Sequence, residues 1–202
     1  MDRQCPVWIW LILILLDLVH FSIEFNYEFV MRDEDVLSEC LDKPQGALNA
    51  NGLFGFSETS FVMSDDGINL SGNISTVWDV NPKDRVQLNL NVLYFDRGIW
   101  QSTIFNMEVK DFCAVMYNEK QFWYKHWSKY ISNAELVKDK CVTNAGTKFL
   151  MEPYLLRITL GSDVYLRPGQ YRIILHALAF DKKNVMRTNQ ICLEIRGEFI
   201  RA

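Results

Sequence analysis

Short runs of alternating apolar and polar residues, separated by turn residues, recur along this chain and favour a strand-rich fold. The clearest run is Arg85 to Phe95, where apolar residues recur at every second position, the period of a strand with one buried face. Asp96-Arg-Gly98 follows and predicts a hairpin turn into a second extended run, Ile99 to Val109. Strands at such short spacing are typical of antiparallel folds.

Six further runs bring the expected number of strands to about eight. They are Phe25 to Met31, Leu53 to Met63, Ile68 to Trp78, Tyr154 to Leu160, Tyr171 to Phe180 and Gln190 to Ile200. The residues Ser64-Asp-Asp-Gly67 predict a hairpin between the second and third of these runs. We therefore expect a mainly β chain, folded as an antiparallel β-sandwich or β-cup. No repeat or linker divides it, so residues 23–202 are expected to form a single domain.

The first 22 residues have the pattern of a signal peptide. Arg3 precedes an apolar run from Trp8 to Leu16, which Asp17 ends. The run is far shorter than the roughly 20 residues that cross a bilayer, and it fits the apolar core of a secretory signal. We expect cleavage after Ser22, with a retained signal anchor as the alternative. The mature chain is then predicted to be secreted, extracellular and without a transmembrane segment.

Secretion determines how the cysteines are interpreted. Cys5 leaves with the signal peptide, which leaves Cys40, Cys113, Cys141 and Cys192 in an oxidising compartment. An even number of cysteines there favours two disulfides, and the absence of a CxxC spacing argues against a zinc site. Three pairings are possible and the sequence does not decide among them. We prefer Cys40–Cys192, which ties the first strand region to the last, and Cys113–Cys141.

Two glycosylation sequons agree with export. They are Asn69-Leu-Ser71 and Asn73-Ile-Ser75. In a strand, Asn69 and Asn73 lie on one face, while Ile68 and Ile74 lie on the other. Both acceptor asparagines are therefore expected to face solvent.

The segment between Cys113 and Cys141 is unusually rich in aromatic residues. Its apolar residues recur at the spacing of one helix face: Trp123, Trp127, Tyr130, Ile131 and Ala134. Asn118 and Gln121 predict a capping box that begins this helix, and Ser128 is expected on its polar side. We therefore expect an amphipathic helix over residues 118–134, inserted into the β body.

The aromatic stripe of this insert has two interpretations. Apolar helix faces usually pack on a neighbouring element, but such a stripe can also cover a cavity. In the second case the candidate ligand-binding residues at the rim or lid are Phe122, Trp123, Trp127 and Tyr130. Burial contributes about 0.8 kcal/mol per CH₂ group, so a long apolar chain would bind without specific polar contacts.

Residues for catalysis and metal binding are scarce. With His20 in the signal segment, only His126 and His176 remain as possible bases, and His126 is expected at the edge of the aromatic helix. Hydrolase, zinc-protease and phosphate-loop motifs are absent, and the acidic clusters lack calcium-loop spacing. The net charge of −4 gives no electrostatic reason to expect nucleic acid. We expect the protein to have no enzymatic activity and no cofactor, metal or nucleic-acid partner. A hydrolase with a dispersed triad is the competing hypothesis.

The signal peptide, the strand-rich body and the positions of the cysteines resemble the insect chemosensory protein B (CheB) family. Cys40 lies near the start, Cys192 near the end, and Cys113 and Cys141 enclose the aromatic insert. This family is similar to the GM2-activator-like, ML-type lipid-binding proteins. The resemblance implies a β-cup with an apolar cavity, a Cys40–Cys192 disulfide joining its ends, and a Cys113–Cys141 disulfide anchoring a loop at its rim.

The resemblance also implies a function. The expected protein is a secreted, non-enzymatic binder of lipids or cuticular-hydrocarbon pheromones in gustatory, contact-chemosensory perception. The alternative is an extracellular accessory protein that contacts a gustatory receptor or a sodium-channel-type membrane protein and carries no ligand. Bound cargo distinguishes the two hypotheses.

Overall fold

The computed structural model describes residues 25–31, 36–64 and 66–202, so the expected signal peptide lies outside the described residues. Ten strands make up most of it: β1 Phe25–Met31, β2 Ser38–Glu39, β3 Phe54–Ser64, β4 Gly67–Thr76, β5 Arg85–Asp96, β6 Ile99–Val109, β7 Lys148–Leu156, β8 Ile158–Ser162, β9 Gln170–Phe180 and β10 Ile191–Arg201. The helical turns are short: η1 Ala50–Gly52, α2 Phe112–Val115, α3 Phe122–His126, η2 Ser128–Tyr130 and α4 Ala134–Val137. The prediction of a mainly β fold is confirmed.

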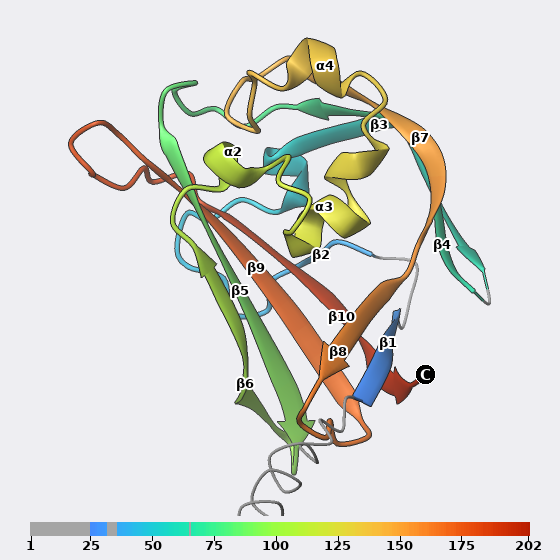
Figure 1. The fold of residues 1–202 in the computed structure, drawn as a ribbon. Coiled ribbons are helices and arrows are strands. Elements are labelled where there is room, and N and C mark those ends of the chain that lie inside the picture. Colours follow the sequence, from blue (N-terminus) through green and yellow to red (C-terminus); the bar gives the residue numbers. More distant parts are fainter. Residues whose placement is uncertain (1–24, 32–35, 65) are drawn as a thin grey trace, which may run out of the picture.

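The strands pair antiparallel in two sheets. The large sheet has the order β6-β5-β9-β10-β1-β8, with β2 also paired to β10, and the small sheet has the order β3-β4-β7. The large sheet curls into a half-barrel, and the small sheet lies across one end of it with the helical segment between them (Figure 1). The chain passes from one sheet to the other at Arg157, between β7 and β8. This arrangement is a β-cup, one of the two predicted architectures.

The turn between β5 and β6 follows from its sequence. Asp96 pairs with Ile99, and the two residues between them, Arg97 and Gly98, have φ angles of 51° and 85°. Positive φ at both central positions is the geometry of the tight hairpin turn whose twist matches that of the strands. The predicted hairpin is confirmed.

A β-bulge changes which face of β3 its side chains occupy. Between Gly55 and Glu58, β3 has one residue more than β4, so the alternation of its side chains shifts by one position. Opposite the bulge Gly72 has a φ of 98°, and a Cβ there would lie 2.0 Å from the carbonyl oxygen of Glu58. Only glycine fits this position, and because of the shift Phe56 and Phe61 both reach the interior.

Apolar side chains form two main clusters, one at each end of the cup. The larger lies between the two sheets and the helical segment; in it Trp78 is fully buried, and its Nε1 donates to the carbonyl oxygen of Asn189 at 2.7 Å. The other surrounds Phe199, whose ring centroid lies 4.9 Å from that of Phe29 and 5.0 Å from that of Tyr171. The aromatic rings of the second cluster hold β1, β9 and β10 together at the far end of the cup.

Both disulfides have the preferred pairing. Cys40, just after β2, is bonded to Cys192 of β10, with their Cα atoms 5.8 Å apart. Cys113 of α2 is bonded to Cys141, beyond α4, with their Cα atoms 5.4 Å apart. The first disulfide ties the start of the chain to the last strand, and the second closes the helical segment into a loop.

The prediction of a single helix over residues 118–134 is wrong. Trp127 (φ −146°, ψ −71°) and Ile131 (φ −79°, ψ 100°) leave the helical conformation, so α3, η2 and α4 are separate turns. Ile131 instead forms a β-bridge with Met151 of β7. Ser128, expected on the polar face, is buried, and its hydroxyl donates to the carbonyl oxygen of Met116 at 2.7 Å. Contacts with β7 and α2 have replaced the hydrogen bonds of a continuous helix.

The predicted start of that helix is also wrong. Asn118 forms a turn, in which its side-chain oxygen accepts from the N–H of Lys120 at 3.0 Å. Gln121 is the cap of α3, and its side chain makes no capping hydrogen bond.

Two strand boundaries also differ from the prediction. The run from Tyr154 to Leu160 is not one strand, because β7 ends at Leu156 and β8 begins at Ile158. β7 starts earlier than expected, at Lys148, and β2 was not predicted. The break at Arg157 is where the chain changes sheets, and a local pattern of apolar residues does not encode this change.

Candidate functional site

An apolar cavity of about 250 Å³ lies between the two sheets and the helical segment. Its wall comes from all three strands of the small sheet, from β5, β6, β9 and β10 of the large sheet, and from the segment that includes α2 and α3. The lining is almost entirely carbon, and none of the described residues that line it carries a formal charge at neutral pH. The buried residues of the second apolar cluster do not line it, but Leu90, Leu156 and Ile195, which pack against that cluster, do.

The structure brings three of the four predicted rim residues to this cavity. Phe122, Trp123 and Trp127 line it. Tyr130 does not; its ring stacks on that of Tyr154 with centroids 3.7 Å apart, and Tyr154 is part of the wall. Tyr130 therefore supports the cavity from behind.

The aromatic stripe is held firmly in place. The ring of Trp123 lies 5.2 Å from that of Phe112, and its Nε1 donates to the carbonyl oxygen of Val115 at 3.2 Å. The ring of Trp127 lies 5.8 Å from those of both Phe54 and Phe149. The rings of the stripe therefore pack on the sheets and also line the cavity, so the two interpretations do not exclude each other.

Three phenylalanines of β3 are wall residues that sequence reasoning missed. Phe54, Phe56 and Phe61 all line the cavity. A strand was predicted here, but a regular alternation places Phe56 and Phe61 on opposite faces. The glycine pair Gly55 and Gly72 was the available signal, because glycine inside a strand often marks a bulge.

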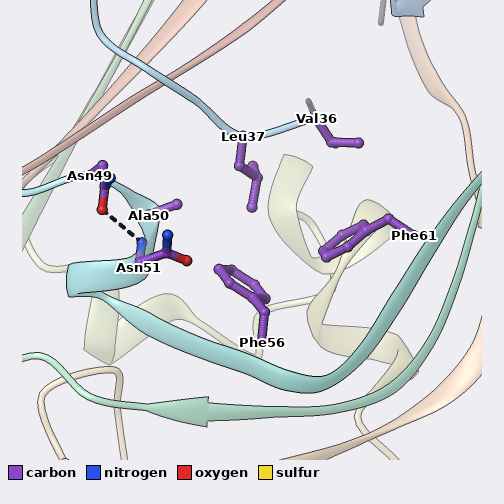
Figure 2. Close-up of a pocket in the computed structure, with 7 residues that line it drawn as sticks. All are labelled: Val36, Leu37, Asn49, Ala50, Asn51, Phe56 and Phe61. Atoms are coloured by element: carbon purple, nitrogen blue, oxygen red, sulfur yellow. Dashed lines mark hydrogen bonds between the residues drawn. The ribbon is translucent and has the colours of Figure 1, made fainter. Parts of the chain in front are cut away.

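A second pocket of about 180 Å³ adjoins the cavity, and the two share Phe56, Phe61, Val36 and Leu37. Figure 2 shows the two phenylalanine rings on one side of this pocket, with the turn at residues 49–51 beside them. In that turn Asn49 accepts a hydrogen bond from the N–H of Asn51 at 3.1 Å (Figure 2). The second pocket is therefore more polar than the cavity.

His126 is the one basic side chain among the described residues of the cavity wall, and the expectation that it lies at an edge is wrong. Only 9% of its surface is exposed. Burial, together with the charges of Lys125 and Lys129, lowers its pKa to about 4, against the opposing effect of a hydrogen bond to the backbone of Arg157. The imidazole is therefore neutral at pH 7.

We expect the free energy of unfolding to decrease as the pH falls from about 6.5 to about 4. In this range the unfolded chain binds a proton at His126, with an ordinary pKa of 6.5, and the folded chain does not. Stability decreases with falling pH wherever the unfolded state binds more protons. The full effect is roughly 3 kcal/mol, of which about 2 kcal/mol is lost by pH 5. Urea unfolding at pH 7 and pH 5, followed by tryptophan fluorescence, measures it.

The His126→Leu variant is the control for this pH dependence. It should lose most of the difference between pH 7 and pH 5. Burial also lowers the pKa of His176, so the His176→Leu variant measures how much the second histidine contributes to the pH dependence of stability. The lowered carboxyl pKa values of Glu28 and Asp84 affect stability chiefly below pH 4.5. An unchanged pH dependence in the His126→Leu variant would contradict the assignment.

The sequon asparagines lie on the outer face of the small sheet. Asn69 is exposed, and Asn73 is partly exposed with its Nδ2 donating to Glu58 at 2.9 Å. Ile68 and Ile74 of the same strand are buried, as predicted.

His176 lies outside the cavity, near the Cys40–Cys192 disulfide. Its ring nitrogen and the two sulfur atoms lie within 4.8 Å of one another. Because the sulfur atoms are bonded to each other, this cluster offers a metal only the histidine nitrogen.

A scan against models of protein families finds no match, and neither does a search of curated proteins. In the part of the chain that the structure describes, the helices are too short and too polar to cross a membrane.

Proposed function

We propose that the protein is a secreted, non-enzymatic binder of hydrophobic small molecules such as lipids or hydrocarbons. The observation that carries this proposal is the apolar cavity of about 250 Å³ inside the cup. A cavity of roughly 150 Å³ with an apolar lining already stays dry and takes up benzene. A larger one with the same kind of lining is suited to a longer apolar molecule.

Binding would draw its free energy from the hydrophobic effect. Each methylene group moved from water into the cavity contributes about 0.8 kcal/mol, or roughly a fourfold increase in affinity. Rings such as Trp123 and Trp127 offer a large contact area that packing has already fixed, so little side-chain entropy is lost on binding. We therefore expect selectivity mainly for the length and shape of the chain.

The chemistry of the wall favours binding over catalysis. His126 and Tyr154 are its titratable side chains, and burial raises the pKa of Tyr154 while it lowers that of His126. Both are uncharged at neutral pH, and among the described residues no carboxylate lines the wall to orient the histidine as a base.

The proposed extracellular location and chemosensory role have separate support. Two disulfides are typical of an oxidising compartment. The role in gustatory perception rests on the resemblance to the CheB family. The accessory-protein alternative uses the aromatic stripe as an exposed contact surface. The inward position of Trp123, of which 7% is exposed, favours a ligand instead.

The first experiment identifies the cargo. The chain is expressed through a secretory pathway, extracted with organic solvent, and analysed for co-purified lipids by mass spectrometry. Long-chain cargo in stoichiometric amount would support the proposal. A protein that is empty and also fails to bind added lipids would favour the accessory role.

A cavity-filling substitution tests where the ligand lies. Leu175 of β9 lines the cavity, so we expect Leu175→Trp to reduce the affinity for the fluorescent hydrocarbon diphenylhexatriene by tenfold or more. Leu178, on the opposite face of β9, is the matched control, and Leu178→Trp should bind the probe normally. Equal binding by both variants would place the ligand elsewhere. Alanine at Trp123 and Trp127 is less informative, because it also removes core contacts.

A further inference from the structure

We propose that the preferred ligand is a long-chain alcohol whose hydroxyl group donates a hydrogen bond to Nε2 of His126, while its chain occupies the apolar cavity. This inference rests on the proposed function and specifies the class of ligand. It follows from Nε2 of His126, a buried polar atom without a hydrogen-bond partner in a residue that lines the cavity.

Among the described residues, three buried side-chain nitrogen or oxygen atoms have no hydrogen-bond partner. They are Tyr117 Oη, Arg172 Nε and His126 Nε2. Of the three residues only His126 lines the cavity. A buried polar atom without a partner destabilises the protein by roughly 1–3 kcal/mol, so a ligand that supplies the partner gains affinity from it.

The hydrogen bonds of the ring determine which partner Nε2 requires. His126 donates to the backbone of Arg157, an interaction that raises its pKa and therefore has the ring as the donor. Because Nε2 has no partner, this donor is Nδ1. A neutral imidazole with its hydrogen on Nδ1 has a lone pair on Nε2, which accepts and does not donate. The missing partner is a donor, such as an O–H group.

The position of His126 suits the polar end of a chain. Phe122 packs on the imidazole with ring centroids 4.5 Å apart, and it also lines the cavity. Since 37% of Phe122 is exposed, this part of the wall reaches the protein surface. Displacement of the Phe122 ring would open Nε2 to a hydroxyl group that enters here, and the rest of the molecule would extend inward.

Two other classes of ligand fit less well. An alkane fills the cavity but leaves Nε2 without a partner. A carboxylate has no donor for Nε2, and no cation lines the cavity in the part of the chain that the structure describes. The nearby Lys125 donates to the hydroxyl of Thr159 at 3.1 Å, and the ammonium of Lys129 lies 4.6 Å from the ring of Tyr130.

The test measures how dodecane, dodecanol and dodecanoate displace diphenylhexatriene from the full secreted protein at pH 7. We expect dodecanol to bind roughly tenfold more tightly than dodecane, the gain from one buried hydrogen bond. In the His126→Leu variant the ratio of the two affinities should fall to about one. His176→Leu, at the histidine outside the cavity, should keep the preference.

Each outcome has a separate meaning. Equal affinities in the unchanged protein, or a preference that survives His126→Leu, would overturn the role of His126 and leave the proposed function intact. Tighter binding of dodecanoate would show that a cation governs selectivity. Binding of none of the three ligands, nor of the probe, would refute the proposed function itself. Cooperative urea unfolding, followed by tryptophan fluorescence, shows that the His126→Leu variant is folded.

Discussion

The Glu194→Gln variant is expected to lose about 3–5 kcal/mol of unfolding free energy, because it leaves the buried cation of Arg172 without its main counter-ion. Glu194 is fully buried, and its carboxylate accepts from Arg172 at 3.4 Å, from Arg196 at 2.6 Å and from the backbone N–H of Leu41 at 3.2 Å. Arg172 is 1% exposed, and its other partner, Asp42, is largely in solvent. Chemical denaturation at pH 7 measures the loss.

Two further variants show whether burial is the cause. Glu58 forms an ion pair with Lys148 at the surface, and Glu58→Gln should hardly change stability, because solvent screens exposed pairs. The double variant Arg172→Met with Glu194→Leu removes both buried charges and should lose less stability than Glu194→Gln alone. A loss as large in Glu58→Gln as in Glu194→Gln would contradict the explanation.

Replacing Cys40 and Cys192 by alanine is expected to destabilise the protein by about 5 kcal/mol, against about 3.5 kcal/mol for the Cys113–Cys141 pair. The two disulfides close loops of 152 and 28 residues in the unfolded chain. The longer loop removes more conformational entropy from the unfolded state. Guanidinium unfolding of the two double-alanine variants gives the comparison.

The reverse order of these losses would contradict the loop-entropy explanation. It would show that the contacts of Cys113–Cys141 within the helical segment outweigh the length of the loop. If the variant lacking Cys40–Cys192 is not secreted, partial reduction of the unchanged protein followed by unfolding provides the same comparison.

The strands were predictable wherever one face of a strand is buried along its whole length. β5 and β9 pair over ten residues, with Val86, Ala177 and Ile173 buried on the inner side, so alternation along the sequence reports the fold directly. The Asp96-Arg-Gly98 turn is a local signal of the same kind. Most strands of the β-cup could therefore be predicted from local patterns of a few residues.

The helical segment was predicted less well, because distant contacts determine its conformation. The spacing of Trp123, Trp127 and Ile131 is helical, but the β-bridge of Ile131 with Met151 interrupts the helix. The sequence does identify three of the aromatic side chains that line the cavity, Phe122, Trp123 and Trp127. The sequence does not show that the predicted helix is divided into separate turns. A continuous helix would lose the contacts with β7.

The burial of His126 was not predictable from the sequence for a related reason. A histidine between lysines, as in Lys125-His-Trp127-Ser-Lys129, has the local character of a surface residue. Only the packing of Phe122 against its ring, together with its hydrogen bond to the backbone of Arg157, places it in the cavity wall.

The bulge lets β3 carry one extra residue without losing its aromatic wall. Phe61 and Met63 pair with Leu70 and Ile68, which are buried, and directly opposite residues of an antiparallel pair lie on the same face. Deletion of Ser57 would remove the bulge but leave this pairing unchanged, so Phe61 and Met63 would keep their orientation. Phe56 and Phe61 would then be four residues apart in a regular strand, again on one face, so the wall tolerates a change in the length of β3 at this point.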